Sequence, residues 1–211
     1  MADVELREFE EKDFRASAGI LGDTWFGDEP ETERVILGGA AFADMMRRAT
    51  YSQVALVDGK VAGVTLARAG DPDLQTAASW LRVADGLVEH LRDINAAEAD
   101  RALVNARAEN AIDAELLAMS GCDERYEVVL LICSEDVRGL GLGKTLLDCS
   151  EAYLISQGAC EAFLYTDEGC TWGFYEHRGL RRAAELHPES EGSASGADLL
   201  SGYYLYVEEL G

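Results

Sequence analysis

A glycine-rich stretch between a predicted strand and a predicted helix carries the most informative chemistry in this sequence. It reads Val137-Arg138-Gly139-Leu140-Gly141-Leu142-Gly143-Lys144-Thr145. Such a turn exposes backbone N–H groups to an anion, and the N-terminus of the following helix adds its dipole. Arg138 and Lys144 add positive charge. We therefore expect this turn to hold a phosphate group.

The spacing of the glycines within the turn distinguishes between three kinds of phosphate-binding loop. A Walker A loop needs four residues between its first glycine and Gly-Lys-Thr, whereas Gly139 and Gly143 are separated by three. A dinucleotide-binding fingerprint needs a third glycine where Lys144 stands. The pattern that fits is R-x-x-G-x-G, formed by Arg138, Gly141 and Gly143.

This pattern resembles the acetyl coenzyme A pyrophosphate loop of the GCN5-related N-acetyltransferase (GNAT) superfamily. A second stretch, from Leu164 to Leu180, is similar to the superfamily's second cofactor segment, in which a helix ends in F-Y-E-x-x-G-[FL]. The strand, helix and hairpin patterns of residues 4–68 match the first half of that fold. The resemblance covers roughly three quarters of the chain and implies a bacterial member carrying a helical insertion.

The resemblance implies an α/β fold of mixed α+β type, with a central mixed sheet flanked by helices. We expect one domain over residues 1–211, with an inserted helical pair at about 71–122. The implied activity is acetyl transfer from acetyl-CoA, a cosubstrate, to a primary amine by direct attack, with no metal. The implied cofactor-binding residues are Ile132, Cys133, Arg138, Gly139, Leu140, Gly141, Leu142, Gly143, Lys144 and Thr145.

Three chemical roles remain to be filled in such a reaction: a base for the amine, a donor for the carbonyl oxygen and an acid for the thiolate. Glu127 lies eleven positions before Arg138, where the resemblance implies a catalytic glutamate. Strand alternation predicts that Glu127 shares a face with Val129, Leu131 and Cys133. The alternatives are a water chain as the base, and a Glu127 that faces solvent or pairs with a neighbouring arginine.

For the carbonyl oxygen, the resemblance implies the backbone N–H of Cys133, at a point where the family's sheet splits. A covalent role for the Cys133 thiol is the alternative, although a thiol in an apolar run has a raised pKa. For the thiolate, the resemblance implies Tyr175, whose phenol has a suitable ordinary pKa near 10. The alternative is a core aromatic beside Trp172 and Phe174.

Several residues near the second motif can be interpreted in two ways. Glu168 stands where the family often has an asparagine that contacts the pantetheine arm. His177 is either a base or a polar residue on the outer face of a short helix. A basic group is a candidate for the adenosine 3′-phosphate or a solvated turn: Arg178, Arg181 and Arg182.

Composition limits the partners. The 211 residues include 40 acidic and 18 basic side chains, a net charge of -22, which disfavours nucleic acid. No apolar run is long enough to span a membrane, and the start lacks a signal-peptide pattern, so we expect a cytoplasmic protein. Five cysteines without a C-x-x-C pair indicate reduced core thiols. The acidic surface favours a cationic small-molecule or peptide amine as acceptor.

The hydrophobic pattern predicts alternating strands and helices around the motifs. Predicted strands are 4–9, 52–57, 61–68, 127–133, 162–166 and 203–207. Predicted helices start near 13 and cover about 31–48, two segments within 71–122, about 143–157 and about 170–177. Residues 185–198 are predicted to form a solvated loop. The insertion is expected to shape the acceptor side of the cleft or a homodimer interface.

Two functions from other classes stay open at this point. A non-catalytic acyl-CoA sensor would keep the glycine turn and would need neither Glu127 nor Tyr175. Phosphoryl transfer through Gly-Lys-Thr would require nucleotide binding. Because both Glu127 and Tyr175 are present, the acetyltransferase is the preferred hypothesis.

Overall fold

A computed structural model describes residues 2–188, 197 and 199–211. The strands are β1 (Val4–Glu8), β2 (Tyr51–Val57), β3 (Lys60–Ala69), β4 (Tyr126–Cys133), β5 (Glu161–Asp167), β6 (Arg181–Leu186) and β7 (Tyr203–Glu209). The α-helices are α1 (Phe14–Trp25), α2 (Glu31–Arg48), α3 (Leu74–Ile94), α4 (Ala96–Ser120), α5 (Leu142–Ser156) and α6 (Gly173–Arg178). Short 3-10 helices are η1 (Glu11–Asp13) and η2 (Glu135–Val137).

The strands form one mixed sheet in the order β1-β2-β3-β4-β5-β7-β6. Neighbouring strands pair antiparallel except β4 and β5, which run parallel. The β4–β5 ladder has a single register pair, Glu127 with Phe163. The two strands therefore stop pairing after these residues, which leaves backbone groups free at their carboxyl ends. The predicted α/β fold with a mixed central sheet is confirmed.

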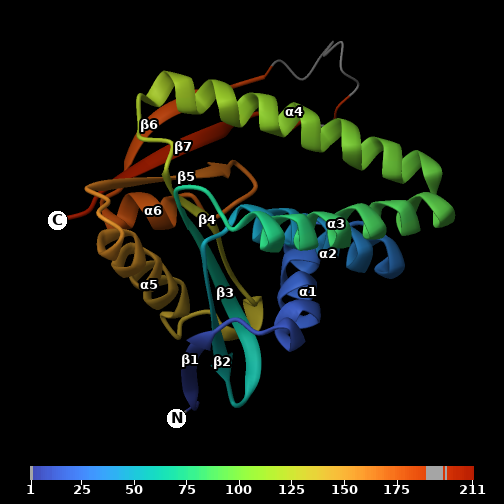
Figure 1. Ribbon diagram of the computed structural model, residues 1–211, viewed down its shortest axis with the longest axis horizontal. Coiled ribbons are helices and arrows are strands. Elements are labelled where there is room, and N and C mark those ends of the chain that lie inside the picture. Colours follow the sequence, from blue (N-terminus) through green and yellow to red (C-terminus); the bar gives the residue numbers. More distant parts are fainter. Residues whose placement is uncertain (1, 189–196, 198) are drawn as a thin grey trace.

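Helices cover both faces of the sheet (Figure 1). Helices α1 and α2 pack on β2, β3 and β4 through a core that includes Leu21, Phe42 and Leu66. On the opposite face, α5 packs Leu147 and Leu154 against the sheet, and α6 lies beside it. The site described below lies where β4 and β5 separate between these two layers.

The segment at 71–122 forms two helices, as its periodicity predicts. Asp73 caps α3 by accepting a hydrogen bond from the Thr76 N–H at 2.8 Å. Asn95 caps α4 in the same way, and Gly121 ends α4 in a left-handed conformation. Helix α3 packs beside α2, whereas α4 crosses over β6 and β7 (Figure 1).

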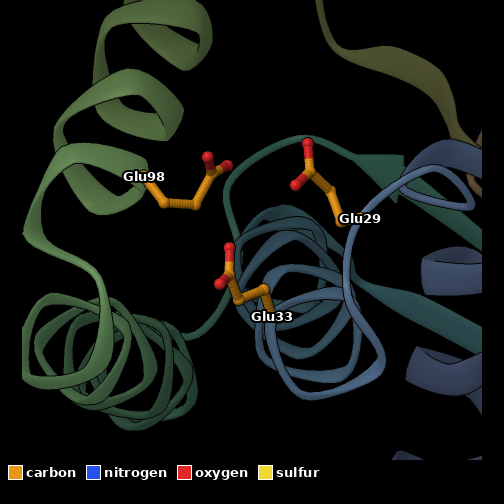
Figure 2. Close-up of side chains that lie close together, drawn as sticks. All are labelled: Glu29, Glu33 and Glu98. Carbon is orange, nitrogen blue, oxygen red and sulfur yellow. The ribbon is translucent and has the colours of Figure 1, made fainter.

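The start of α4 is tied to α2 by a group of charged side chains. Figure 2 shows Glu98 of α4 facing Glu33 of α2 and Glu29 of the preceding loop. Arg101 donates to both Glu29 and Glu98, the latter at 2.6 Å. Asn95 donates to Glu33 at 3.3 Å. These contacts hold the N-terminus of α4 in place, and the rest of the helix then extends across the sheet.

Strand β6 differs from the sequence-based expectation. Its sequence, Arg-Arg-Ala-Ala-Glu-Leu, is poor in β-branched and aromatic residues and gives little strand signal. The antiparallel pairing with β7 supplies what local propensity lacks. The predicted loop at 185–198 begins inside β6, and its residues 189–196 and 198 lie outside the described residues. In the part of the chain that the structure describes, no helix is long and apolar enough to cross a membrane.

Candidate active site

The glycine-rich turn is built to leave backbone amides open. Gly139 and Gly141 adopt φ values of 87° and 74°, a region that residues with a Cβ rarely occupy. Gly141 is the N-cap of α5 and provides no side chain to cap it. A Cβ at either glycine would meet no atom within 4 Å, so the space beside the turn is open. The first-turn N–H groups of α5 are therefore available to an anion.

The two cations of the turn are already paired with acidic side chains. Arg138 contacts Glu135 of η2 at 2.6 Å, and Lys144 contacts Asp148 of α5 at 2.6 Å. Both pairs are solvent-exposed, with Arg138 at 75% and Lys144 at 61% side-chain exposure. Exposed pairs of this kind exchange readily because they contribute about 1 kcal/mol or less. Arg138 and Lys144 can thus turn to a phosphate without a large penalty.

Strand β4 contains a bulge that changes which side chains share a face. Leu66 pairs with Leu130, but the next residue, Ala67, pairs with Val128, so Val129 is an extra residue. Leu131 and Cys133 pack on the α5 side of the sheet. The expectation that Glu127, Val129, Leu131 and Cys133 share one face is wrong. Simple alternation across eight residues fails because the bulge inserts one residue into the period.

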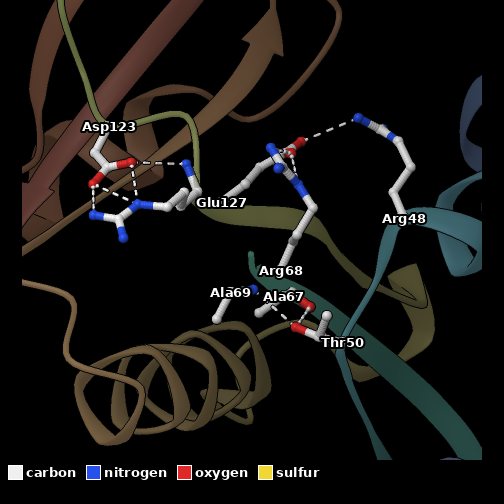
Figure 3. A network of polar contacts seen from close by, with 8 residues as sticks. Arg48, Thr50, Ala67, Arg68, Ala69, Asp123 and Glu127 are labelled. Atoms are coloured by element: carbon white, nitrogen blue, oxygen red, sulfur yellow. Dashed lines mark hydrogen bonds and ion pairs between the residues drawn. The ribbon is translucent and has the colours of Figure 1, made fainter. Parts of the chain in front are cut away.

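Glu127 therefore faces the layer that contains α2. Its side chain is 2% exposed. Arg68 donates to Glu127 Oε2 from Nε at 3.0 Å and from Nη2 at 2.7 Å. Arg48, at the end of α2, donates to Glu127 Oε1 at 3.3 Å (Figure 3). Glu127 thus pairs with neighbouring arginines and does not face solvent. Its role as the base stays a prediction.

The backbone of Cys133 points into the gap between β4 and β5. The next N–H, of Ser134, donates to Ala62 O on the β3 side at 2.8 Å. Because successive N–H groups of a strand point to opposite sides, the Cys133 N–H points away from β3, toward the side where β5 has separated. This amide can donate to a carbonyl oxygen placed in the gap.

The Cys133 side chain is packed on the other layer. A Cβ at Gly63 would lie 2.9 Å from Cys133 Sγ and 2.9 Å from Leu146, so Gly63 makes the room for this thiol. Burial raises the pKa of Cys133 to about 11. The thiol is therefore protonated at neutral pH, which disfavours the nucleophile alternative. Ile132 faces the opposite layer and packs in the core with Leu130.

Tyr175 lies on α6, on the same side of the sheet as Cys133. Its ring packs at 5.8 Å from that of Tyr206 and at 5.4 Å from that of Phe174. Burial raises the pKa of Tyr175, and the neighbouring Cys170, Cys133 and Asp167 raise it further. The phenol is thus kept protonated and can act as a donor.

The neighbours of Tyr175 have structural partners. Glu168 accepts from the Ser201 N–H at 2.8 Å and from its hydroxyl, which joins the end of β5 to the segment before β7. His177 is exposed and contacts Gly173 O within its own helix. This matches the outer-face alternative for His177.

The basic residues at the end of α6 and the start of β6 also contact neighbouring side chains. Arg178 contacts Glu151 and Asp148 of α5. Arg182 contacts Glu176 at 2.9 Å and lies over the ring of Tyr204, 4.2 Å from its centroid. Neither arginine lies in a solvated turn, because Arg178 belongs to α6 and Arg182 belongs to β6.

Sequence reasoning missed a group of carboxyl side chains on the face that holds Glu127. Helix α4 contributes Glu109 and Asp113, and the end of β5 contributes Asp167. All three are close enough to Tyr203 to raise its pKa. The spacing of Glu109 and Asp113 places them on adjacent turns beside Ile112, which packs on the sheet. That i, i+4 carboxylate pair flanking an apolar position is the signal that could have found them.

Comparisons with known proteins agree with this fold. The acetyltransferase (GNAT) family model matches residues 6–180. Arylalkylamine N-acetyltransferase 2 from Aedes aegypti has a similar structure, with a TM-score of 0.60 and 16% identity over 99% of this chain and 100% of that one. The ribosomal-protein-S18-alanine N-acetyltransferase from Escherichia coli has a TM-score of 0.56 and 12% identity over 99% and 95%. No curated protein sequence matches the chain.

The family model sets the class of this protein, an acetyltransferase, and the sheet that splits beside the glycine-rich N-terminus of α5 is in keeping with it. The family model covers residues 6–180 of the 211. The chain belongs to the GNAT acetyltransferase family and is an acetyl-CoA-dependent acyltransferase.

Proposed function

We propose that this protein transfers the acetyl group of acetyl-CoA to the primary amine of a cationic small molecule or peptide by direct attack. The observation that carries the proposal is the Cys133 N–H, which faces the gap where β4 and β5 separate. The open glycine turn begins a few residues later along the chain. A carbonyl oxygen and a pyrophosphate can therefore be bound by one continuous segment.

The proposed cofactor-binding and catalytic residues lie on one face of the sheet, and the proposed acceptor site lies on the other. On the α5 side, the amides of Gly141, Leu142 and Gly143 bind the pyrophosphate, with Arg138 and Lys144 turning from their exposed partners. The Cys133 N–H stabilises the negative charge that develops on the carbonyl oxygen. Tyr175 stays protonated at neutral pH, because burial raises its pKa, and it gives its phenolic proton to the departing thiolate.

The reaction balances without a further reactant. The acceptor arrives as an ammonium ion and loses one proton before its nitrogen attacks the thioester carbon. The C–N bond forms, the C–S bond breaks, and the sulfur takes a proton from Tyr175. The nitrogen then loses a second proton, which restores the phenol through solvent. The net products are an acetamide, free coenzyme A thiol and one proton.

The acceptor side is the layer that contains α2 and α4. There the described carboxylates of Glu109, Asp113 and Asp167 lie near one another, and this favours a positively charged acceptor. The structurally similar enzymes named above act, by their names, on an arylalkylamine and on a protein alanine. Both are primary amines, so they guide the choice of test compounds.

The proposal is tested by binding and turnover measured separately. Calorimetry with acetyl-CoA measures binding, and a thiol-reactive dye measures release of coenzyme A with spermidine, tyramine, lysine or an alanine-starting peptide. We expect acetyl-CoA binding and thiol release that depends on at least one amine. Binding without amine-dependent release would identify a sensor and contradict the transferase. A thermal shift with Mg-ATP would instead support phosphoryl transfer.

A further inference from the structure

Helix α4 brings an acidic side chain to the acceptor side of the split sheet. Asp113 follows Ile112, which packs with Phe163 and Leu205 in the core under α4. Asp113 is partly buried as a result. Phe163 is the residue at which β5 stops pairing with β4. Asp113 is therefore held above the point where the strands separate.

The charged surroundings of Asp113 come from α2, α4, β4, β5 and β7. Its charged or titratable neighbours are Arg48 of α2, Glu109 of α4, Glu127 of β4, Tyr165 and Asp167 of β5 and Tyr203 of β7. These residues lie on both sides of the gap between β4 and β5. An ammonium group bound at the gap on this face would therefore lie among the groups that surround Asp113.

Asp113 and Glu127 differ in how their carboxylates are occupied. Both oxygens of Glu127 accept hydrogen bonds from guanidinium groups, of Arg68 and of Arg48. The Asp113 side chain forms no hydrogen bond or close ion pair with any residue that the structure describes. A protonated Glu127 would leave Arg68 and Arg48 without their counter-charge, whereas Asp113 can take a proton without breaking a contact.

We infer that Asp113 accepts the first proton from the acceptor's ammonium group, directly or through one water, and that Glu127 acts as a positioning residue for Arg48 and Arg68. The inference rests on the proposed function. The N–H bond of the ammonium breaks, its electron pair stays on nitrogen, and the proton forms an O–H bond on Asp113. The proton leaves to solvent before the next cycle.

The acid–base properties of Asp113 agree with this role. Burial raises its pKa to about 7, and the negative neighbours Glu127, Glu109 and Asp167 add to the effect against the opposing pull of Arg48. A carboxyl group with such a pKa is present in both forms near neutral pH. This is the range in which a general base works best.

The decisive comparison is between Asp113→Asn and a matched variant on the same helix, Glu115→Gln. Glu115 is exposed and lies two residues further along α4. With acetyl-CoA and spermidine, tyramine, lysine and the alanine-starting peptide, we expect Asp113→Asn to lower kcat/KM at pH 7 by about 100-fold. Acetyl-CoA affinity should change less than about twofold, since Asp113 lies on the acceptor side. Glu115→Gln should match the wild type.

The pH profile separates proton acceptance from a structural role. In the wild type, kcat/KM should rise through an inflection near the pKa of Asp113. In Asp113→Asn only amine that is already neutral reacts, so the rate should keep rising by about tenfold per pH unit below the pKa of the amine. The deficit of the variant should therefore shrink at high pH, which a merely structural defect would not produce.

A titration that does not depend on turnover completes the test. Carbon NMR of aspartate-labelled protein, assigned by the signal lost in Asp113→Asn, should show one carboxyl that titrates near pH 7. A carboxyl that titrates below about pH 5, or an active Asp113→Asn with a wild-type profile, overturns this inference alone. A wild type that binds acetyl-CoA but acetylates no amine overturns the proposed function and the proton-transfer role together.

Discussion

Arg68 and Glu127 face each other across β3 and β4, with Arg68 Nη2 at 2.7 Å from Glu127 Oε2. They form a register pair one step from the bulge at Val129. The bulge turns Glu127 toward α2, where Arg48 completes the contact (Figure 3). This pair joins the sheet to the helical layer that contains α2, at the place where the sheet begins to split.

Glu127→Gln is expected to destabilise the protein. The substitution leaves Arg68 and Arg48 without their buried counter-charge, and breaking such a pair from one side costs about 3 kcal/mol. Urea denaturation at pH 7.5 measures the loss. Asp44→Asn on α2 is the control, because Asp44 forms a half-exposed pair with Arg47 and should change the free energy of unfolding by about 0.5 kcal/mol or less. Equal effects in the two variants would contradict the prediction.

Tyr175→Phe is expected to lower kcat by about 100-fold and to leave acetyl-CoA binding unchanged. The phenylalanine ring can keep the contacts with Tyr206 and Phe174, but it cannot protonate a thiolate. Steady-state assays of thiol release give kcat, and calorimetry gives the affinity for acetyl-CoA. Tyr126→Phe, which removes an exposed hydroxyl at the start of β4, should retain activity. A fully active Tyr175→Phe would exclude the phenol as the acid.

Gly141→Ala is expected to weaken acetyl-CoA binding by at least about tenfold. A Cβ at φ 74° costs about 1–2 kcal/mol, and relief of that strain would rotate the amides of the turn. Gly158→Ala is the matched control, because Gly158 has φ 90° after the other end of α5. Both variants should lose similar stability in thermal melts, but only Gly141→Ala should lose affinity. Equal affinities would show that the turn does not hold the pyrophosphate.

Asp113→Asn is expected to stabilise the protein at alkaline pH. The pKa of Asp113 is raised in the fold to about 7 from an unfolded value near 4, so its charged form is disfavoured by folding. That penalty is fully present above pH 7 and declines as the pH falls toward the unfolded pKa. Unfolding in urea should show a gain on the order of 2 kcal/mol at pH 8 that becomes smaller at pH 5. A loss of stability at pH 8 would show that Asp113 is held by favourable contacts.

The elements that local sequence can specify were predicted well. The strand at 126–133, the helix that follows the glycine turn and the paired helices in 71–122 all appear in the structure. Strand β6 was missed because its residues favour no strand until β7 pairs with them. The predicted face of Glu127 was wrong because β4 contains a bulge, and a bulge depends on how β3 pairs with β4.

The sequence by itself determined the glycine-rich turn and the start of α5. The spacing of Arg138, Gly141 and Gly143 acts within one turn, where backbone conformation and amide direction follow from neighbouring residues. Only the tertiary structure decided the arrangement of charged groups on the opposite face of the sheet. Arg48, Arg68, Asp113 and Glu127 are far apart along the chain, and they meet because α2, α4 and the sheet pack together. Burial and charge pairing at that junction depend on distances between elements, which no local sequence pattern specifies. The packing of these elements therefore decides that the Glu127 carboxylate is held by arginines and that the Asp113 carboxylate is free to accept a proton.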